Sequence, residues 1–171
     1  MARLSPDERR VAIIEAALAV AQRQGLGATT VRDVATEMGT SSGLIHHYFA
    51  SMDDVLAAAF EHAAGGDLAK ARAAIEAQAD PARQLDTFIE SYAPAQSDRT
   101  MQLWLDAWAE ASRRPALQEV SRRLNREWQA LVRDIVEHGV AIGAFTTDDP
   151  EATAWRLLSV LDGLTLPFDL P

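Results

Sequence analysis

The chain has 171 residues, of which 48% are hydrophobic and 24% charged, a composition typical of a globular protein and unlike that of disordered or fibrous chains. The absence of cysteine excludes disulfides, thiolate nucleophiles and Cys-ligated zinc. The longest uncharged run, residues 38–52, contains Ser, Thr, His and Gly and is shorter than the roughly 18 apolar residues that a membrane span requires. The opening segment, MARLSPDERR, lacks the apolar core of a signal peptide. We therefore expect a cytoplasmic protein that has no membrane partner.

The formal net charge of −9 is unevenly distributed along the chain. A negative net charge at first argues against nucleic acid as a partner, because neutralising phosphates requires Lys and Arg. Residues 1–50, however, contain five basic and five acidic side chains, whereas residues 51–171 contain 11 basic and 20 acidic ones and carry the whole net charge. This division predicts two surfaces with different functions, although a solvated acidic helix face produces the same pattern.

A helix-capping signal opens the chain. Residues 5–8 (SPDE) combine an N-cap hydroxyl, a proline at the first helical position and a glutamate that can bond back to the cap. Apolar side chains then recur at helical spacing, at Val11, Ile14, Leu18 and Ala21. Gly25 is expected to end this helix.

Two short helices follow, in a helix-turn-helix pattern. Thr30 begins a helix over residues 31–38, Ser41 can cap another over about 42–49, and Gly39 lies where the turn requires a left-handed backbone. The residues expected to face inward are Val34, Met38, Ile45 and Tyr48, with Ala35 as the small residue where the helices cross.

Helices are also predicted for the rest of the chain. Ser51 opens a long one, in which Gly65–Gly66 predicts a kink or break because each glycine costs about 1 kcal/mol relative to alanine. The later helices are expected to begin at Asp80–Pro81, at Ser97 or Asp98, at Pro115 and at Asp149–Pro150. With no strand pattern, the sequence predicts an all-α fold. The pattern predicts an N-terminal three-helix helix-turn-helix domain (residues 1–50), the arrangement of a DNA-binding domain, followed by a C-terminal helical-bundle domain (residues 51–171); the family resemblance given below implies ligand binding and dimerisation for the latter.

The second helix of the motif presents small polar side chains and a histidine pair outward, at Ser41, Ser42, Gly43, His46 and His47. Short hydroxyls reach phosphates or base edges, glycine allows close backbone approach, and histidine can donate to a guanine acceptor. The alternative is a structural corner that binds nothing, but such a corner more often presents Lys and Glu. A metal site at the histidine pair is weaker still, because neighbouring helical residues diverge by about 100°.

From about residue 5 to residue 56 the chain resembles the tetracycline-repressor-like (TetR) transcriptional regulators. The residues that carry the resemblance read TTVRDVATEMGTSSGLIHHYFASMDDVL. The resemblance implies a homodimer whose recognition helices enter successive major grooves of a palindromic double-stranded DNA operator, and a C-terminal lobe that binds a small-molecule effector. It also implies that Thr30 and Tyr48, and more weakly Arg32, contact phosphates. Ser41, Ser42, His46 and His47 then face base edges.

The chain departs from the family pattern in two places. Where the family usually has a lysine, near the start of the fourth helix, this chain has Met52 followed by Asp53 and Asp54. We therefore expect modest operator affinity, or a contribution from Arg9, Arg10 and an N-terminal arm. The family also commonly has one more helix after the one that begins near Asp149. Because this sequence ends at Pro171, we expect either that the last helix was lost or that dimerisation rests on fewer contacts.

The C-terminal lobe resembles the subgroup that includes choline-responsive, BetI-like repressors, on the segments WLDAWAEASRRPALQEVSRRLNREW and DPEATAWRLLSVLDGL. Candidate ligand-binding residues are Phe60, Phe88, Tyr92, Met101, Trp104, Trp108, Trp128 and Trp155. Aromatic residues at helical spacing are more often simply core. An indole face near Asp106 or Glu110 could hold a quaternary ammonium group by cation–π attraction, and acyl-chain effectors fit so apolar a lobe equally well.

The sequence thus favours a ligand-responsive DNA-binding regulator, more often a repressor than an activator by its resemblance. The moving part is expected to be the fourth helix, near Gly65–Gly66. No cofactor or metal is expected, and enzyme function is disfavoured because the chain offers no activated nucleophile or spaced acid/base pair. The remaining alternative is a helical ligand-binding protein that has lost DNA binding, which the acidic balance and the missing lysine make plausible.

Overall fold

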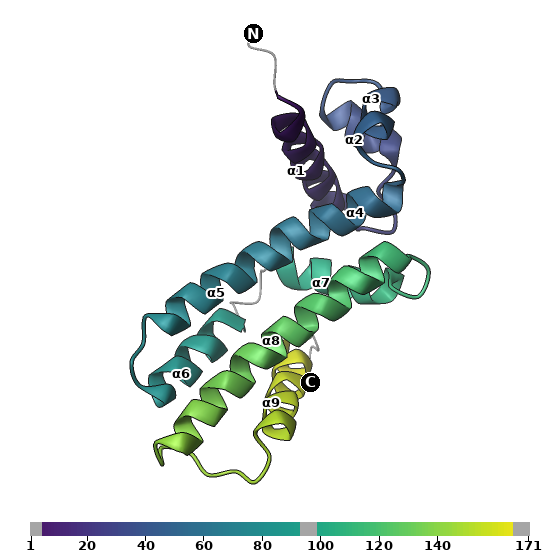
Figure 1. The fold of residues 1–171 in the computed structure, drawn as a ribbon. Helices are drawn as coiled ribbons and strands as arrows, with labels where there is room; N and C mark the ends of the chain where they lie inside the picture. The colour runs from purple at the N-terminus through teal and green to yellow at the C-terminus, as the bar shows by residue number, and fades with distance from the viewer. Residues whose placement is uncertain (1–4, 93–98, 166–171) are drawn as a thin grey trace. The chain divides into compact units, whose positions relative to one another are not determined.

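A computed structural model describes residues 5–92 and 99–165, and within these ranges the chain is helical and forms no strand (Figure 1). The helices are α1 (Pro6–Gln24), α2 (Val31–Glu37), α3 (Ser42–Tyr48), α4 (Met52–Phe60), η1 (Glu61–Gly65), α5 (Gly66–Glu76), α6 (Pro81–Tyr92), α7 (Arg99–Glu110), α8 (Pro115–Ala141) and α9 (Pro150–Thr165). The all-α fold class is confirmed. The predicted caps Ser97 and Asp98 lie outside the described residues, as does the chain after residue 165. Over the described ranges, no helix is both long and apolar enough to cross a membrane.

The helices begin where the sequence predicts caps. The Ser5 backbone N–H donates to Glu8 at 2.7 Å, and the Glu8 N–H donates to the Ser5 hydroxyl at 3.2 Å, which completes a capping box. Asp149 accepts from the backbone of the first turn of α9. At the other end of α1, Gly25 has a φ of 87°, a conformation that other residues avoid.

The buried face of α1 differs from the predicted stripe. Of the residues at helical spacing, Val11 is 44% exposed, Ile14 and Leu18 are partly buried, and Ala21 is buried. The fully buried positions are instead Ile13 and Ala17. Alanine permits the close approach of α4, the helix that packs most extensively on α1, whereas a stripe of larger side chains holds two helices apart.

The first four helices, which we call the head, share one hydrophobic core (Figure 1). Its buried members are Ile13, Ala16, Ala17, Val34, Ala35, Ile45, Phe49, Val55 and Ala59. The predicted inward positions are confirmed, since Val34 and Ile45 are buried and Met38 and Tyr48 pack partly buried against the cluster. This core fixes the direction of α3 relative to the rest of the head.

The chain divides into two compact units, each of which draws on separate stretches of sequence. Unit 1 comprises residues 1–66 and 99–122, so the head shares a unit with α7 and the first part of α8. Within it, α7 packs against α1 and η1. Unit 2 comprises residues 67–98 and 123–171 and thus contains α5, α6, the rest of α8 and α9. The domain boundary at residue 50 stays a prediction.

No break occurs at Gly65–Gly66. The backbone stays helical from Met52 to Glu76, and its irregularity is a π-helical turn over Glu61–Gly65. Gly66 has an ordinary right-handed conformation with φ −61°. Of the predicted kink or break, the break does not occur, and the π turn ends next to the residue at which unit 1 passes into unit 2. Such turns are rare and often lie at functional sites.

Unit 2 has its own apolar core. Its buried side chains include Leu68, Ile75, Phe88, Leu124, Trp128, Leu131, Ile135, Leu158 and Leu161. Beside the end of α8, the Phe145 ring occupies the space that a side chain on Gly139 would need, because a Cβ there would lie 2.1 Å from the ring. Glycine is thus required for the chain to fold back after α8.

Candidate functional site

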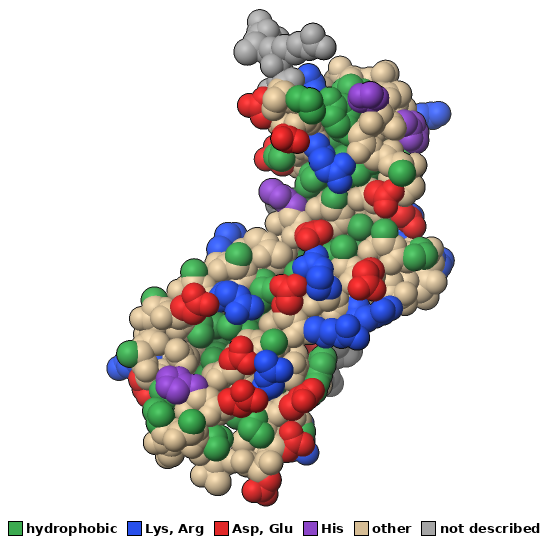
Figure 2. All heavy atoms as spheres, viewed as in Figure 1, with side chains coloured by type: hydrophobic (Ala, Val, Ile, Leu, Met, Phe, Trp, Pro, Cys, Tyr) green, Lys and Arg blue, Asp and Glu red, His purple; other side chains and the backbone are tan. Residues whose placement is uncertain are grey.

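Helix α3 presents its predicted reading residues to solvent. Ser41, Gly43, His46 and His47 are exposed and Ser42 is half-buried, whereas Ile45 on the opposite face is 1% exposed. Figure 2 shows histidine side chains on the surface in the region of α2 and α3. Ser41 occupies the N-cap position, as predicted, but its hydroxyl makes no cap hydrogen bond. A short helix with small polar residues at its N-terminal end is the form that enters a major groove.

The turn before α3 depends on glycine. Gly39 has a φ of 63°, the left-handed conformation that the sequence predicts for this position. The Gly39 N–H donates to Thr36 at 3.1 Å, and the Thr40 N–H donates to Ala35 at 2.9 Å, so the turn is hydrogen-bonded on both sides of the glycine. The angle between α2 and α3 is therefore set by backbone geometry as well as by the core.

The two residues at the start of α2 that are predicted to contact phosphates, Thr30 and Arg32, have different surroundings. The Thr30 hydroxyl donates to Asp33 Oδ2 at 2.6 Å and accepts from the Asp33 N–H at 3.3 Å, and the adjacent Arg32 is exposed. The hydrogen bonds from Thr30 lower the pKa of the Asp33 carboxyl, which keeps this cap charged. A phosphate at Thr30 therefore has to bind alongside a carboxylate, whereas Arg32 is available without rearrangement.

Arg10 of α1 holds the C-terminal end of α3. Its Nη1 donates to the Tyr48 carbonyl at 2.9 Å, and its guanidinium lies 4.0 Å from the centre of the Phe49 ring. A cation is favoured at a helix C-terminus and over an aromatic face. Phe49 is buried, and Tyr48 makes an edge-on contact with His47 at 5.2 Å, so Arg10 supports the segment that includes the histidine pair. The expected DNA contacts of Arg9 and Arg10 stay predictions.

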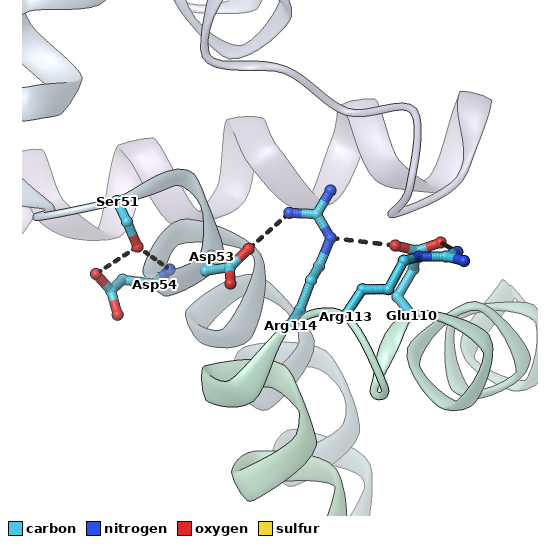
Figure 3. A network of polar contacts seen from close by, with 6 residues as sticks. All are labelled: Ser51, Asp53, Asp54, Glu110, Arg113 and Arg114. Atoms are coloured by element: carbon cyan, nitrogen blue, oxygen red, sulfur yellow. Dashed lines mark hydrogen bonds and ion pairs between the residues drawn. The ribbon is translucent and has the colours of Figure 1, made fainter.

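The acidic residues at the start of α4 are engaged within the protein (Figure 3). Arg114 Nη1 donates to Asp53 Oδ1 at 2.6 Å, with the two side chains 22% and 30% exposed. Asp54 accepts from the Ser51 hydroxyl at 2.8 Å, and its N–H donates back to that oxygen at 3.1 Å. Of the two acids that follow Met52, Asp53 is therefore charge-paired and Asp54 takes part in the cap of its own helix.

Glu110 extends the same network. Arg113 donates to Glu110 Oε1 at 2.6 Å, and Arg114 donates through Nε to Glu110 Oε2 at 3.2 Å (Figure 3). The bond from Arg113, with help from Arg114, lowers the pKa of the Glu110 carboxyl. The hydrogen bond to Asp53 raises the pKa of Arg114, so Arg114 and Glu110 both keep their charges near neutral pH.

Asp106 is bonded to the head. Its Oδ2 accepts from the Leu26 backbone N–H at 3.0 Å, and its Oδ1 accepts from Gln102 at 3.1 Å. Asp106 and Glu110 were the two carboxylates expected near an indole face. Both already have partners in unit 1, so a cationic ligand there has to compete with hydrogen bonds and ion pairs.

The eight candidate ligand-binding residues fall into two groups. In unit 1, Trp104 contacts Phe60 edge-on at 4.8 Å and Trp108 at 5.6 Å, and Met101 lies on the same helix. In unit 2, Phe88, Tyr92 and Trp128 form a cluster with ring centres 5.0–5.9 Å apart. Trp155, on α9, is 43% exposed.

Asp162 joins the aromatic cluster of unit 2. The Tyr92 hydroxyl donates to its Oδ1 at 2.6 Å. Burial raises the pKa of Asp162, with the bond from Tyr92 opposing this in part, and burial together with that bond raises the pKa of Tyr92. Sequence reasoning missed Asp162, because 70 residues separate it from Tyr92 and no local pattern links them. Over the described ranges, no group of three or more His, Cys, Asp or Glu residues could hold a metal ion.

Comparison with known proteins gives matches over both parts of the chain. A family model described as "Bacterial regulatory proteins, tetR family" matches residues 13–59, and one described as "BetI-type transcriptional repressor, C-terminal" matches residues 81–170. The HTH-type transcriptional regulator BetI of Paraburkholderia xenovorans is 30% identical, over 94% of this chain and 85% of its own. BetI of Rhizobium meliloti is 32% identical, over 91% and 75%. A protein of Saccharomonospora viridis, solved in complex with choline, has 26% identity and a TM-score of 0.83, over 94% and 84%.

Replacing Asp162 by Asn tests the buried carboxylate. Because its pKa is raised, the folded state holds a proton at pH values where the unfolded state has lost it, so stability falls as pH rises through that window. Asn keeps an acceptor for Tyr92 and carries no charge. We expect the Tm of D162N relative to wild type to rise from about pH 4, near the unfolded pKa of Asp, towards neutral pH. The exposed Asp86→Asn on α6 is the control, and an equal pH trend in it contradicts the assignment.

Proposed function

Because the chain belongs to the TetR family of bacterial transcriptional regulators, we propose that it binds a palindromic operator as a homodimer and represses transcription until a small-molecule effector binds. The observation that carries the proposal is the outer face of α3, where Gly43, His46 and His47 are exposed above a rigid core. A helical ligand-binding protein without DNA binding is the alternative. The pairing of Asp53 with Arg114 weakens it, because the start of α4 then repels phosphates less strongly.

In this proposal some residues contact DNA phosphates and position the motif, and others contact base edges and give sequence specificity. Arg32 and Tyr48, at either end of the motif, contact phosphates and fix its register, and Thr30 adds a hydroxyl. Ser41, Ser42, His46 and His47 reach base edges, with Gly43 allowing close approach of the backbone. Since acidic and basic side chains mingle over the surface in Figure 2, binding relies on these contacts more than on a general attraction to DNA.

The homodimer is proposed to form through α9. Its face turned away from the unit 2 core exposes Trp155 (43%), Val160 (59%) and Leu164 (75%), with Arg156 and Gly163 between them. Such large apolar side chains on one helix are unusual at a free surface and typical of an interface. The glycine permits close approach of a second helix. The occupant we propose is a second copy of the chain, since an operator with two half-sites requires two heads.

The effector is proposed to be a quaternary ammonium compound that binds among Phe88, Tyr92, Trp128 and Asp162. Aromatic faces attract such a cation, and the carboxylate supplies the opposite charge. A related protein of Saccharomonospora viridis was solved with choline, which supports this class. The three rings are in direct contact, so a ligand has to part α6 from α8. Binding is thereby linked to a change of conformation, as an effector requires.

A gel-shift titration tests DNA binding, using the chromosomal region that flanks the coding sequence, random DNA of equal length and a salt series. The wild type should retard the flanking fragment preferentially. His46→Ala with His47→Ala should reduce the preference, since each good base contact contributes about 1–3 kcal/mol of discrimination. Equal loss on both DNAs contradicts base contact by the histidines. No retardation by a folded, dimeric wild type, even at low salt, contradicts the regulator proposal.

The dimer proposal predicts that Val160→Asp yields monomers, because a buried charge without a partner destabilises an interface strongly. Sedimentation velocity gives the mass of each variant, and circular dichroism checks that the helices are retained. Ile142→Asp, at a residue that is 60% exposed just after α8, is the matched control and should stay dimeric. A dimeric V160D, or a monomeric wild type, rejects this interface.

Choline serves as the probe of the effector proposal. Isothermal titration calorimetry should show binding to wild type and to D86N, and at least about tenfold weaker binding to D162N, which corresponds to about 1.4 kcal/mol. Trp128 fluorescence should change only in the variants that bind. If the wild type does not bind choline, the quaternary ammonium proposal fails, and acyl-chain effectors become the next candidates.

A further inference from the structure

Helix α7 has two different faces within unit 1. On one side Leu103 and Ala107 are buried, and Trp104 packs against Phe60. The other side carries polar residues one helical turn apart, at positions 102, 106 and 110. A movement of the indole groups therefore moves the carboxylates, because both belong to one rigid helix.

The carboxylates of α7 contact the loop that joins α1 to α2. Asp106 accepts from the Leu26 N–H at 3.0 Å, and Leu26 itself is fully buried. Glu110 lies so close to the same loop that a Cβ on Gly27 would be 2.8 Å from its Oε1. Gly27 does not have a positive φ, so the absence of a side chain there serves the approach of Glu110 and not the backbone conformation.

A second connection reaches α4. Arg114, in the turn between α7 and α8, bonds to Glu110 and to Asp53 at the same time. Its side chain is 22% exposed, whereas that of the neighbouring Arg113 is 69% exposed and bonds only to Glu110 among the contacts of Figure 3. The head is thus held at two points, at the end of α1 and at the start of α4, the helix that follows α3.

We propose that Asp106, Glu110 and Arg114, here called the polar clamp, hold the head in its DNA-reading position, so that operator affinity depends on residues that do not touch DNA. Arg114 is the central positioning residue, because it bonds both to Glu110 on α7 and to Asp53 at the start of α4. It also offsets the charge of Asp53 at the DNA-binding end of the head. This inference rests on the proposed operator binding. It adds a set of contacts inside the protein, the polar clamp, that controls the affinity for the operator.

Arg114→Gln and Arg113→Gln are the decisive pair, since both remove one positive charge at adjacent positions. We expect R114Q to lower operator affinity about tenfold, within the usual range of coupling between sites. R113Q should lower it clearly less, because it leaves both bonds of Arg114, to Glu110 and to Asp53, in place. The slope of log affinity against log salt should be unchanged in R114Q, because a residue that contacts a phosphate changes that slope by about one and a positioning residue does not. Equal loss in both variants, or a changed slope, overturns the proposal.

Gly27→Ala perturbs the clamp from the head side without changing any charge. The methyl group has to displace the Glu110 carboxylate, which Arg113 and Arg114 hold, so operator affinity should fall as in R114Q. The double variant D53N/R114Q should lose no more operator affinity than R114Q alone, because the two substitutions break the same ion pair between Asp53 and Arg114. Additive losses contradict the role of that bond.

Hydrogen exchange separates failure of this inference from failure of the proposed function. Peptides covering residues 24–30 and 52–56 should exchange faster in R114Q and G27A than in wild type and R113Q, while thermal unfolding confirms that each variant is folded. Faster exchange with unchanged operator affinity overturns the clamp alone. A wild type that binds no DNA overturns the proposed function, and the positioning role with it.

Discussion

The close crossing of α2 over α3 is the constraint on which the rest of the reading surface depends. Ala35 is buried at this crossing, and Gly39 turns the backbone with a φ of 63° just after it. Because Val34 and Ile45 fill the core beneath, the side chains at positions 46 and 47 have to point outward. The histidine pair is therefore displayed by packing on the opposite side of a seven-residue helix, which is too short to be stable by itself.

The acidic groups near the proposed DNA-contact face are neutralised by individual neighbouring residues and not by an overall basic surface. A chain with a net charge of −9 binds a polyanion only if its contact face is free of unpaired acids. At the start of α4 this is achieved by Arg114 for Asp53 and by the helix cap for Asp54. At the end of α3, Arg10 balances the negative end of the helix dipole. Two arginines that need not touch DNA thus make the surface around α3 acceptable to it.

The parts of the fold that could be predicted from sequence are those decided within a few residues. Capping at Ser5 and Thr30, the turn at Gly39 and the inward positions of α2 and α3 follow from local hydrogen bonds and helical spacing. The residues of α1 that are fully buried do not follow from hydrophobicity, because close packing buries the smaller Ala17 and leaves Val11 exposed. The break at Gly65–Gly66 was mispredicted because a helix can absorb strain in a π turn.

The parts of the candidate site that could not be predicted are contacts between distant residues. Arg10 and Tyr48 are 38 residues apart, Asp53 and Arg114 are 61 apart, and Tyr92 and Asp162 are 70 apart. In each case the sequence shows an ordinary charged or aromatic residue on a helix, and only the fold supplies its partner. Asp53 illustrates the effect, since an acid that looks unfavourable for DNA binding becomes half of an ion pair.

The free energy of contacts such as the Asp53–Arg114 ion pair is similar to the coupling free energy between the sites of a ligand-controlled regulator. A hydrogen bond to a charged group contributes about 1.5–3 kcal/mol, and coupling between an effector site and a distant site is typically about 1–3 kcal/mol. In the proposed function, one or two bonds of this kind, together with the packing of α7 on α1 and η1, keep the head in place in the absence of effector. The same bonds are weak enough for the differential binding of one small molecule to overcome them. A purely apolar junction of similar area would resist such a change, because its many contacts have to be lost together, whereas Arg114 can release Asp53 and be hydrated at once.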